Sequence, residues 1–300
     1  MRVVEGRIPF RGFETWYRDV GPEGGIPLLC LHGGPGSTHH YFKPLEELAD
    51  DGRRVVVYDQ LGCGSSDRPD DPDLWTVELF VDEVRTVRDA LGLDRIHLLG
   101  TSWGSMLAIE YVLTQPPGLV SLTLNSPPTS AESWMAEAAR LRDELPEHHR
   151  RAIAEHEAAR TLDHPDYKAA EEEFWRRHVL LVDPPPDFVE RGKAEKGTPV
   201  YRALWGMSEW NADGKLHNWD VRDRLHEIRV PTLVTSGRYA ECTPALAEAA
   251  QSGIPGAERV TFVERYDPSL PLVVGDDEKL KQVILNLVRN ALDALADRPE

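Results

Sequence analysis

Residues 95–113 read RIHLLGTSWGSMLAIEYVL, and this stretch decides the fold. It opens with an apolar run typical of a parallel strand buried on both faces, and it closes with SMLAIEYVL, a helical pattern. Between them stands Gly100-Thr101-Ser102-Trp103-Gly104, a G-x-S-x-G motif. Such a motif also occurs by chance in plain glycine-flanked turns. Its place between a strand and a helix nevertheless favours a sharp turn that exposes the Ser102 hydroxyl, with glycines where side chains would collide with the backbone.

Other apolar runs on both sides of this stretch predict further strands. They lie at 26–32 (IPLLCLH), 53–59 (RRVVVYD), 121–125 (SLTLN), 229–236 (RVPTLVTS) and 258–263 (ERVTFV). Residues 74–91 have apolar side chains at intervals of three and four, which predicts a helix with one buried face. The alternation of strands and helices predicts an α/β fold with a doubly wound, mostly parallel sheet.

The middle of the chain differs in composition from the segments on either side. From about Pro127 to about Asp220 the sequence is rich in Ala, Glu, Arg and His and contains no strand-like run. We therefore expect a helical cap at 127–220, inserted between a first part of the core at 1–126 and a second part at 221–263. The remaining tail, 264–300, contains the pattern of an amphipathic helix at 275–296.

Composition excludes several classes of function. Lys and Arg total 34 against 51 Asp and Glu, a net charge of -17, so neither nucleic acid nor an anionic membrane is expected as a partner. No apolar run approaches the about 20 residues of a membrane helix, and the first residues lack a signal-peptide pattern, so we expect a cytoplasmic protein.

Cys30, Cys63 and Cys242 form no metal-binding pattern, so we expect buried thiols, no metal and no cofactor. Nothing in the sequence indicates an oligomeric state.

A second motif supports the first. His32-Gly33-Gly34-Pro35-Gly36 follows the strand at 26–32 and supplies backbone N–H groups at the carboxyl edge of the sheet. Together with the N–H of Trp103, the N–H of Gly34 can hold the oxyanion of a tetrahedral acyl intermediate. A phosphate-binding loop would need a Lys followed by a Ser or Thr at its end, and this pair is missing here.

Several longer segments carry a resemblance to a known family. They are HGGPG at 32–36, YDQLGCGSSDRP at 58–69, GTSWG at 100–104, MSEWNADGKLHNWD at 207–220 and VPTLVTSGRYAECTP at 230–244. Through them residues 1–262 resemble the proline iminopeptidases, α/β-hydrolase-fold serine peptidases that release an N-terminal residue, typically proline. The resemblance implies that Ser102 is the nucleophile and that Glu209 and Glu241 bind the free amino group of a small peptide or aminoacyl substrate. Both glutamates also fit an ordinary solvated or salt-bridged role.

The resemblance fails at the two partners that a serine nucleophile needs, a histidine base and an acid that orients it. The family's acid belongs in the loop after the strand at 229–236, where this chain has Ala240. The family's histidine belongs after the strand at 258–263, where residues 264–271 read ERYDPSLP, with Asp267 near the expected position. The last histidine of the sequence is His226. We therefore expect an inactive hydrolase scaffold that can still bind peptide amino termini.

Replacements for the missing groups are few. Glu241 is one position away and is already matched to substrate binding, and Asn125, at the end of its strand, carries no charge. His39, His40 and His217 lie on loops that can approach the cleft, but a base must be placed to within about half an ångström. An active prolyl aminopeptidase that uses such a base is the first alternative.

The tail resembles a different family. Residues 264–296 are similar to the N-box region of a nitrogen-regulation-type sensor histidine kinase, where asparagines matching Asn286 and Asn290 face ATP phosphates and magnesium. We interpret the chain as a chimera whose C-terminal helix replaces the last helix of the hydrolase. A partial ATP-binding module is the second alternative, but the D-x-G-x-G and glycine-rich lid motifs of that site are missing from the sequence, so ATP binding is not expected.

Overall fold

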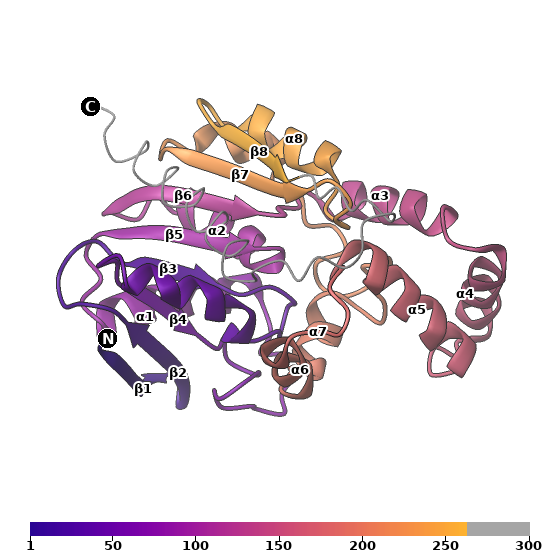
Figure 1. Ribbon diagram of the computed structural model, residues 1–300, viewed down its shortest axis with the longest axis horizontal. Coiled ribbons are helices and arrows are strands. Elements are labelled where there is room, and N and C mark those ends of the chain that lie inside the picture. The colour runs from indigo at the N-terminus through magenta and orange to yellow at the C-terminus, as the bar shows by residue number, and fades with distance from the viewer. Residues whose placement is uncertain (263–300) are drawn as a thin grey trace, which may run out of the picture.

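The computed structural model describes residues 1–262, and this part of the chain forms one eight-stranded sheet (Figure 1). The strands are β1 (Val3–Phe10), β2 (Phe13–Val20), β3 (Leu28–Leu31), β4 (Val55–Tyr58), β5 (Ile96–Thr101), β6 (Leu119–Asn125), β7 (Thr232–Gly237) and β8 (Glu258–Phe262). Their order across the sheet is β1-β2-β4-β3-β5-β6-β7-β8. β1 and β2 run antiparallel to each other, β2 runs antiparallel to β4, and the remaining pairs are parallel. The predicted α/β fold with a mostly parallel sheet is confirmed.

The parallel strands formed where continuous apolar runs predicted them, whereas the hairpin of β1 and β2 was not anticipated. β1 exposes every other residue along most of its length, so its sequence alternates and shows no apolar run. Arg11 and Gly12 both have positive φ, 50° and 88°, as a tight two-residue hairpin turn requires.

Helices cover both faces of the sheet. α1 (Val77–Ala90) and α2 (Trp103–Leu113) pack on the face that carries Leu29 and Leu31. The 3-10 helix η1 (His39–Ala49) packs on the opposite face, against Leu28 and Cys30. This division follows from the alternation of side chains along a strand. Nearly every side chain of α2 is buried, so this helix is held from all sides.

Between β6 and β7 the chain forms five α-helices within the described residues. They are α3 (Ala131–Asp143), α4 (Glu147–Ala159), α5 (Pro165–His178), α6 (Asp187–Ala194) and α7 (Thr198–Leu204). The two ends of this segment meet, because Ala131 N–H donates to Trp219 O at 2.9 Å and Val221 N–H donates to Thr129 O at 3.0 Å. A short 3-10 helix, η2 (Arg222–Glu227), then leads to β7, and α8 (Pro244–Gly253) connects β7 to β8.

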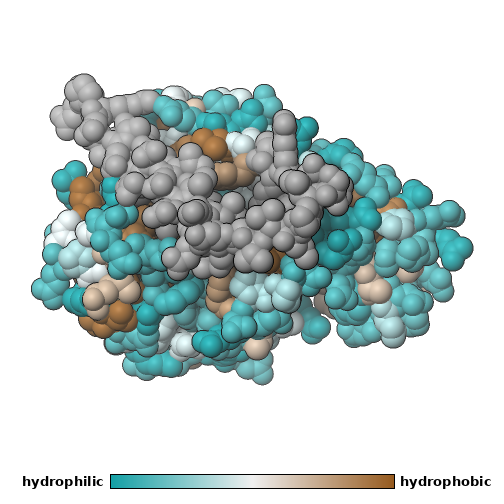
Figure 2. All heavy atoms as spheres, viewed as in Figure 1, coloured by the Kyte–Doolittle hydropathy of each residue, from teal (hydrophilic) through white to brown (hydrophobic). Residues whose placement is uncertain are grey.

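The helical segment therefore forms a cap, and Figure 1 shows it beyond the ends toward which the arrows of β5, β6 and β7 point. The visible surface of the cap is mainly hydrophilic in Figure 2, as the acidic composition leads one to expect. The carboxyl edge of a parallel sheet is where α/β proteins place their ligands. The cap is thus positioned to cover a site at that edge.

Several predictions fall outside the described residues. They are the amphipathic helix at 275–296, the kinase-like asparagines Asn286 and Asn290, and Asp267. Within residues 1–262 no helix is long and apolar enough to cross a membrane. Cys30, Cys63 and Cys242 are buried free thiols, as predicted.

Candidate active site

Ser102 occupies a strained turn between β5 and α2. Its φ and ψ are 54° and -119°, a conformation that a non-glycine residue adopts only when the surrounding structure enforces it. The two flanking glycines provide the room. A Cβ on Gly100 would approach Gly104 O, and a Cβ on Gly104 would approach Leu31 O, both at less than 3.0 Å. The turn has the geometry of a nucleophile elbow, for the steric reason that the motif suggested.

The glycine-rich loop after β3 lies against the same serine. A Cβ on Gly33 would come within 3.2 Å of Ser102 Cβ, and Gly34 has a φ of +116°, which only glycine adopts readily. No acceptor among residues 1–262 is recorded for the N–H of Gly34 or of Trp103. Because Trp103 is the first residue of α2, its N–H has no partner within the helix. The two N–H groups fit the predicted oxyanion hole, which stays a prediction.

A buried hydrogen-bond network joins this loop to the serine turn. His32 Nδ1–H donates to Gly33 O at 3.0 Å, and His32 Nε2 accepts from Gln60 N–H at 2.9 Å. The Gln60 side chain donates to His32 O and accepts from Trp103 Nε1–H at 2.8 Å. Burial lowers the pKa of His32 to about 4, so this ring is neutral. Its hydrogen bonds hold the loop in position, and it does not act as a base. The network explains why HGGPG, DQ and GTSWG occur together.

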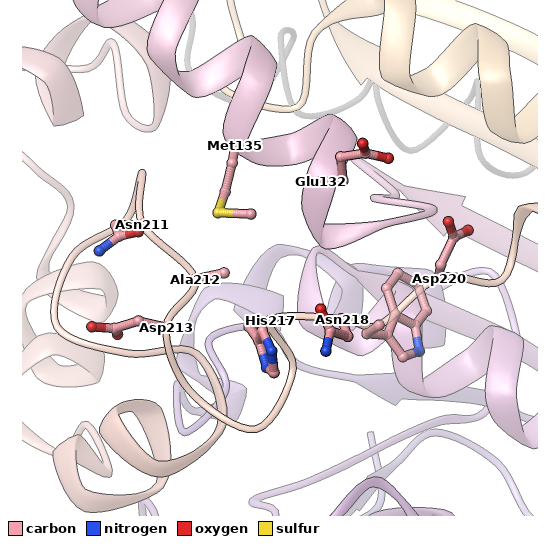
Figure 3. A pocket seen from close by; sticks show the side chains of 9 residues that line it. Glu132, Met135, Asn211, Ala212, Asp213, His217, Asn218 and Asp220 are labelled. Carbon is pink, nitrogen blue, oxygen red and sulfur yellow. The ribbon is translucent and has the colours of Figure 1, made fainter.

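The three histidines considered as substitute bases lie elsewhere. His39 is engaged with the buried carboxylate of Asp59, its Nδ1 at 2.8 Å from Oδ1. His40 Nδ1 lies 3.0 Å from Thr38 Oγ1. Figure 3 shows His217 in a separate pocket, on the loop with Asn218 and opposite α3.

The sequence-predicted site residues meet in one cavity of about 420 Å³ under the cap. It is lined by Gly34, Ser102, Glu209, Ala240 and Glu241, together with Trp175, His178, Lys196 and Tyr201. The methyl group of Ala240 therefore borders the serine cavity. Trp103 is not among the lining residues of this cavity, and Asp267 lies outside the described residues.

Glu209 and Glu241 give the cavity its electrostatic character. Burial raises the pKa of both carboxyls, and for Glu241 the nearby charge of Glu209 raises it further, to well above its usual range. The Lys196 ammonium opposes both shifts. Glu209 Oε2 accepts from the Tyr201 hydroxyl at 2.8 Å, whereas Glu241 Oε2 is buried without a hydrogen-bond partner in the described part of the chain. This pair has an unmet capacity to accept hydrogen bonds from a cation.

His178, the last residue of α5, lines the serine cavity and was not predicted from the sequence. It is 9% exposed, and its Nδ1–H donates to Tyr239 O at 2.9 Å. In the neutral ring Nε2 is then an unprotonated acceptor, and it is buried without a partner within residues 1–262. Burial lowers the pKa of the ring. No local motif marks His178, because it reaches the cavity from the cap, far in sequence from Ser102.

Comparisons with known proteins agree with this geometry. Residues 26–269 match the model of the alpha/beta hydrolase fold family. The chain is 43% identical over 286 residues to the proline iminopeptidase of Lactobacillus helveticus, covering 91% of this chain and 97% of that protein. The crystal structure of proline iminopeptidase from Mycobacterium smegmatis is similar at 38% identity and a TM-score of 0.82, covering 97% of this chain and 99% of that one. The crystal structure of VinJ is similar at 35% identity and a TM-score of 0.87, covering 96% and 99%. The chain belongs to the alpha/beta hydrolase fold family and, within it, to the proline iminopeptidases.

Proposed function

We propose that this chain is a proline iminopeptidase scaffold that binds the amino terminus of small peptides and hydrolyses them no faster than background. One observation carries the proposal. The cavity holds Ser102 and the two glutamates together, while the residue at the position of the family's acid contributes only the methyl group of Ala240.

We expect the peptide amino terminus to bind to the acid pair, Glu209 and Glu241. A primary α-ammonium donates three hydrogen bonds and the pyrrolidinium of an N-terminal proline donates two, and Glu241 Oε2 is a buried acceptor that no described residue satisfies. Charge-assisted bonds of this kind are about twice as strong as neutral ones. The arriving cation also relieves the repulsion that raises the pKa of Glu241. Apolar side chains on the cap side of the cavity, Val179, Leu180, Phe188 and Val189, suit the first residue of such a peptide.

We expect no turnover because Ser102 lacks a base. A serine hydroxyl attacks a carbonyl only when a base removes its proton, and no histidine hydrogen bond to Ser102 is recorded among residues 1–262. The loop 264–271 contains no histidine in its sequence. In one well-studied serine protease the loss of the histidine costs about 10⁶ in kcat. The oxyanion donors alone leave only a small residual rate enhancement.

The binding half is tested by calorimetric titration of a proline-containing dipeptide into the full chain. We expect one site, weakened about tenfold or more by Glu209→Gln, because that change removes a charge-assisted hydrogen bond. Glu147→Gln, an exposed glutamate at the start of α4, is the matched control and should bind like the parent. Equal affinity of Glu209→Gln and Glu147→Gln would overturn the binding role.

A second function, hydrolysis with His178 as the base, is favoured by the bare Nε2 of this residue in the cavity of Ser102. His178→Asn is a discriminating variant, because its amide N–H can still donate to Tyr239 O while the Nε2 position is lost. If His178 is the base, hydrolysis above the Ser102→Ala level disappears in His178→Asn. Ala240→Asp would raise such activity, since a carboxylate beside the ring stabilises its charged form. Ala240→Asn serves as the uncharged control.

A further inference from the structure

The turn that joins α4 to α5 gathers two histidines and one carboxylate. His156 lies in the last turn of α4, His164 precedes the first residue of α5, and Asp166 lies in the first turn of α5. One ligand atom from each of the three lies within 4.8 Å of the others. The two imidazole rings are stacked with their centroids 4.0 Å apart, and His164 Nδ1 is 3.7 Å from Asp166 Oδ2.

The surroundings of His156 resemble those of a metal ligand. This side chain is only 8% exposed, and its Nδ1 is 2.7 Å from Thr161 Oγ1. Thr161 is itself held in place, because its N–H donates to His156 O at 2.9 Å. When Nδ1–H donates to the hydroxyl, Nε2 is left as a bare donor atom for a metal, which is how metal-binding histidines are usually oriented.

The negative charge of Asp166 is not balanced by a neighbouring Lys or Arg in the described part of the chain. In the part of the chain that the structure describes, no Lys or Arg forms an ion pair with it, and its recorded ionic neighbour is His164. His164 and Asp166 are both exposed, so their side chains are able to turn toward a common point, and an ion at His164 Nδ1 would replace the hydrogen bond of 3.3 Å that this atom accepts from Asp166 N–H. The cluster thus combines one fixed ligand with two adjustable ones.

We propose that His156, His164 and Asp166 bind one divalent transition-metal ion, of which zinc is the representative. Two imidazoles with one carboxylate suit zinc and its neighbours, whereas calcium and magnesium prefer oxygen ligands alone. An ion about 2.1 Å from each of two ligand atoms spans at most about 4.2 Å between them. The 3.7 Å pair already satisfies this limit, and small rotations of the two exposed side chains close the remaining separations.

The ion would link the end of α4 to the start of α5. α5 runs from this turn to His178, which lines the serine cavity, so the ion would fasten a helix that forms part of the cavity wall. The sequence predicts no metal site, because its three cysteines form no metal-binding pattern. Here the ligands His156, His164 and Asp166 become neighbours only because the chain reverses between two helices.

Calorimetric titration of zinc chloride into the full chain tests the site. We expect one zinc per chain, with an affinity at least tenfold lower in His164→Ala and in Asp166→Asn. Both changed residues are exposed, so the variants should fold, and thermal unfolding should show zinc raising the Tm of the parent but not of the variants. The three thiols are buried and do not compete for the ion.

His149→Ala is the matched control, because His148 and His149 also stack with centroids 4.0 Å apart but belong to no three-ligand cluster among residues 1–262. It should bind zinc like the parent. Parent-like binding by His164→Ala, an equal loss in His149→Ala, or no zinc bound at all would overturn the proposal. So would calcium binding as tight as zinc binding.

Discussion

At the scale of single residues, the buried carboxyls decide how this protein responds to pH. Glu241 and Glu209 line the serine cavity, and burial raises the pKa of each. A protonated carboxyl does not attract a ligand ammonium, so acid should weaken the binding of peptide amino termini.

We therefore predict that dipeptide affinity rises with pH while the ligand amine stays protonated, and that Glu241→Gln both lowers the affinity and flattens this dependence. The raised pKa of Glu241 places the change above the ordinary carboxyl range of about 4 to 5. Titration calorimetry between about pH 5 and 8 measures it, with Glu147→Gln as control. A parent affinity that stays constant over this window would contradict the role of the acid pair.

Glu83 of α1 predicts a pH dependence of stability. Its Oε1 accepts from Thr15 Oγ1 and from Leu61 N–H, at 2.5 and 2.9 Å, while its Oε2 is buried without a partner in the described chain. Burial raises the pKa of this carboxyl to about 8, above that of the unfolded chain. Between these two pKa values the folded state keeps a proton on Glu83 that the unfolded chain has released. The contribution of this proton to the free energy of unfolding is therefore at its full value below about pH 4.5, and it is lost as the pH rises to about 8.

Over that window the free energy of unfolding should fall with a slope of up to about 1.4 kcal/mol per pH unit from this group. Glu83→Gln keeps the hydrogen-bond acceptor and removes the titration, so urea unfolding of this variant should show a flatter pH profile. Glu78→Gln, exposed on the same helix, should leave the profile unchanged. Identical slopes for the parent and Glu83→Gln would show that Glu83 is ionised in the folded protein.

At the scale of elements, the turn from β5 to α2 depends on close backbone contact. Gly104→Ala would place a Cβ against Leu31 O, on rigid backbone of β3. We expect a loss of about 3 kcal/mol or more in the free energy of unfolding. Gly92→Ala is the control, since Gly92 has a φ of +61° but open space around its Cβ position, and should cost only about 1 kcal/mol. Denaturant midpoints compare the two, and equal losses would contradict the packing argument.

The elements also show what sequence could predict. Strands β3 to β5 are buried on both faces, so their apolar runs stand out, and the glycines of the serine turn follow from a fixed backbone geometry. β1 alternates between exposed and less exposed residues, and β2 mixes charged and apolar residues, so neither strand carries such a signal. The cap helices could be predicted as a group from composition, but not which of their residues reach the cavity.

At the scale of the whole molecule, the site depends on contacts between distant parts of the chain. Ser102 and the glycine-rich loop could be assigned from motifs, because each is local in sequence. His178 could not, since α5 meets the loop with Tyr239 only through the path of the cap. The cluster of His156, His164 and Asp166 escaped prediction for a different reason, since its residues are close in sequence but meet only where the chain reverses between α4 and α5. Ala240 is the opposite case, because a missing carboxylate is visible in the sequence itself.

We propose, in short, that a complete binding cavity surrounds Ser102 and that this serine lacks a functioning base. Hydrolysis of a chromogenic prolyl arylamide by the purified chain, beside Ser102→Ala, tests it most directly. We predict the same background rate for both proteins. A rate for the parent well above that of Ser102→Ala would contradict the claim, because it would require a base that activates Ser102.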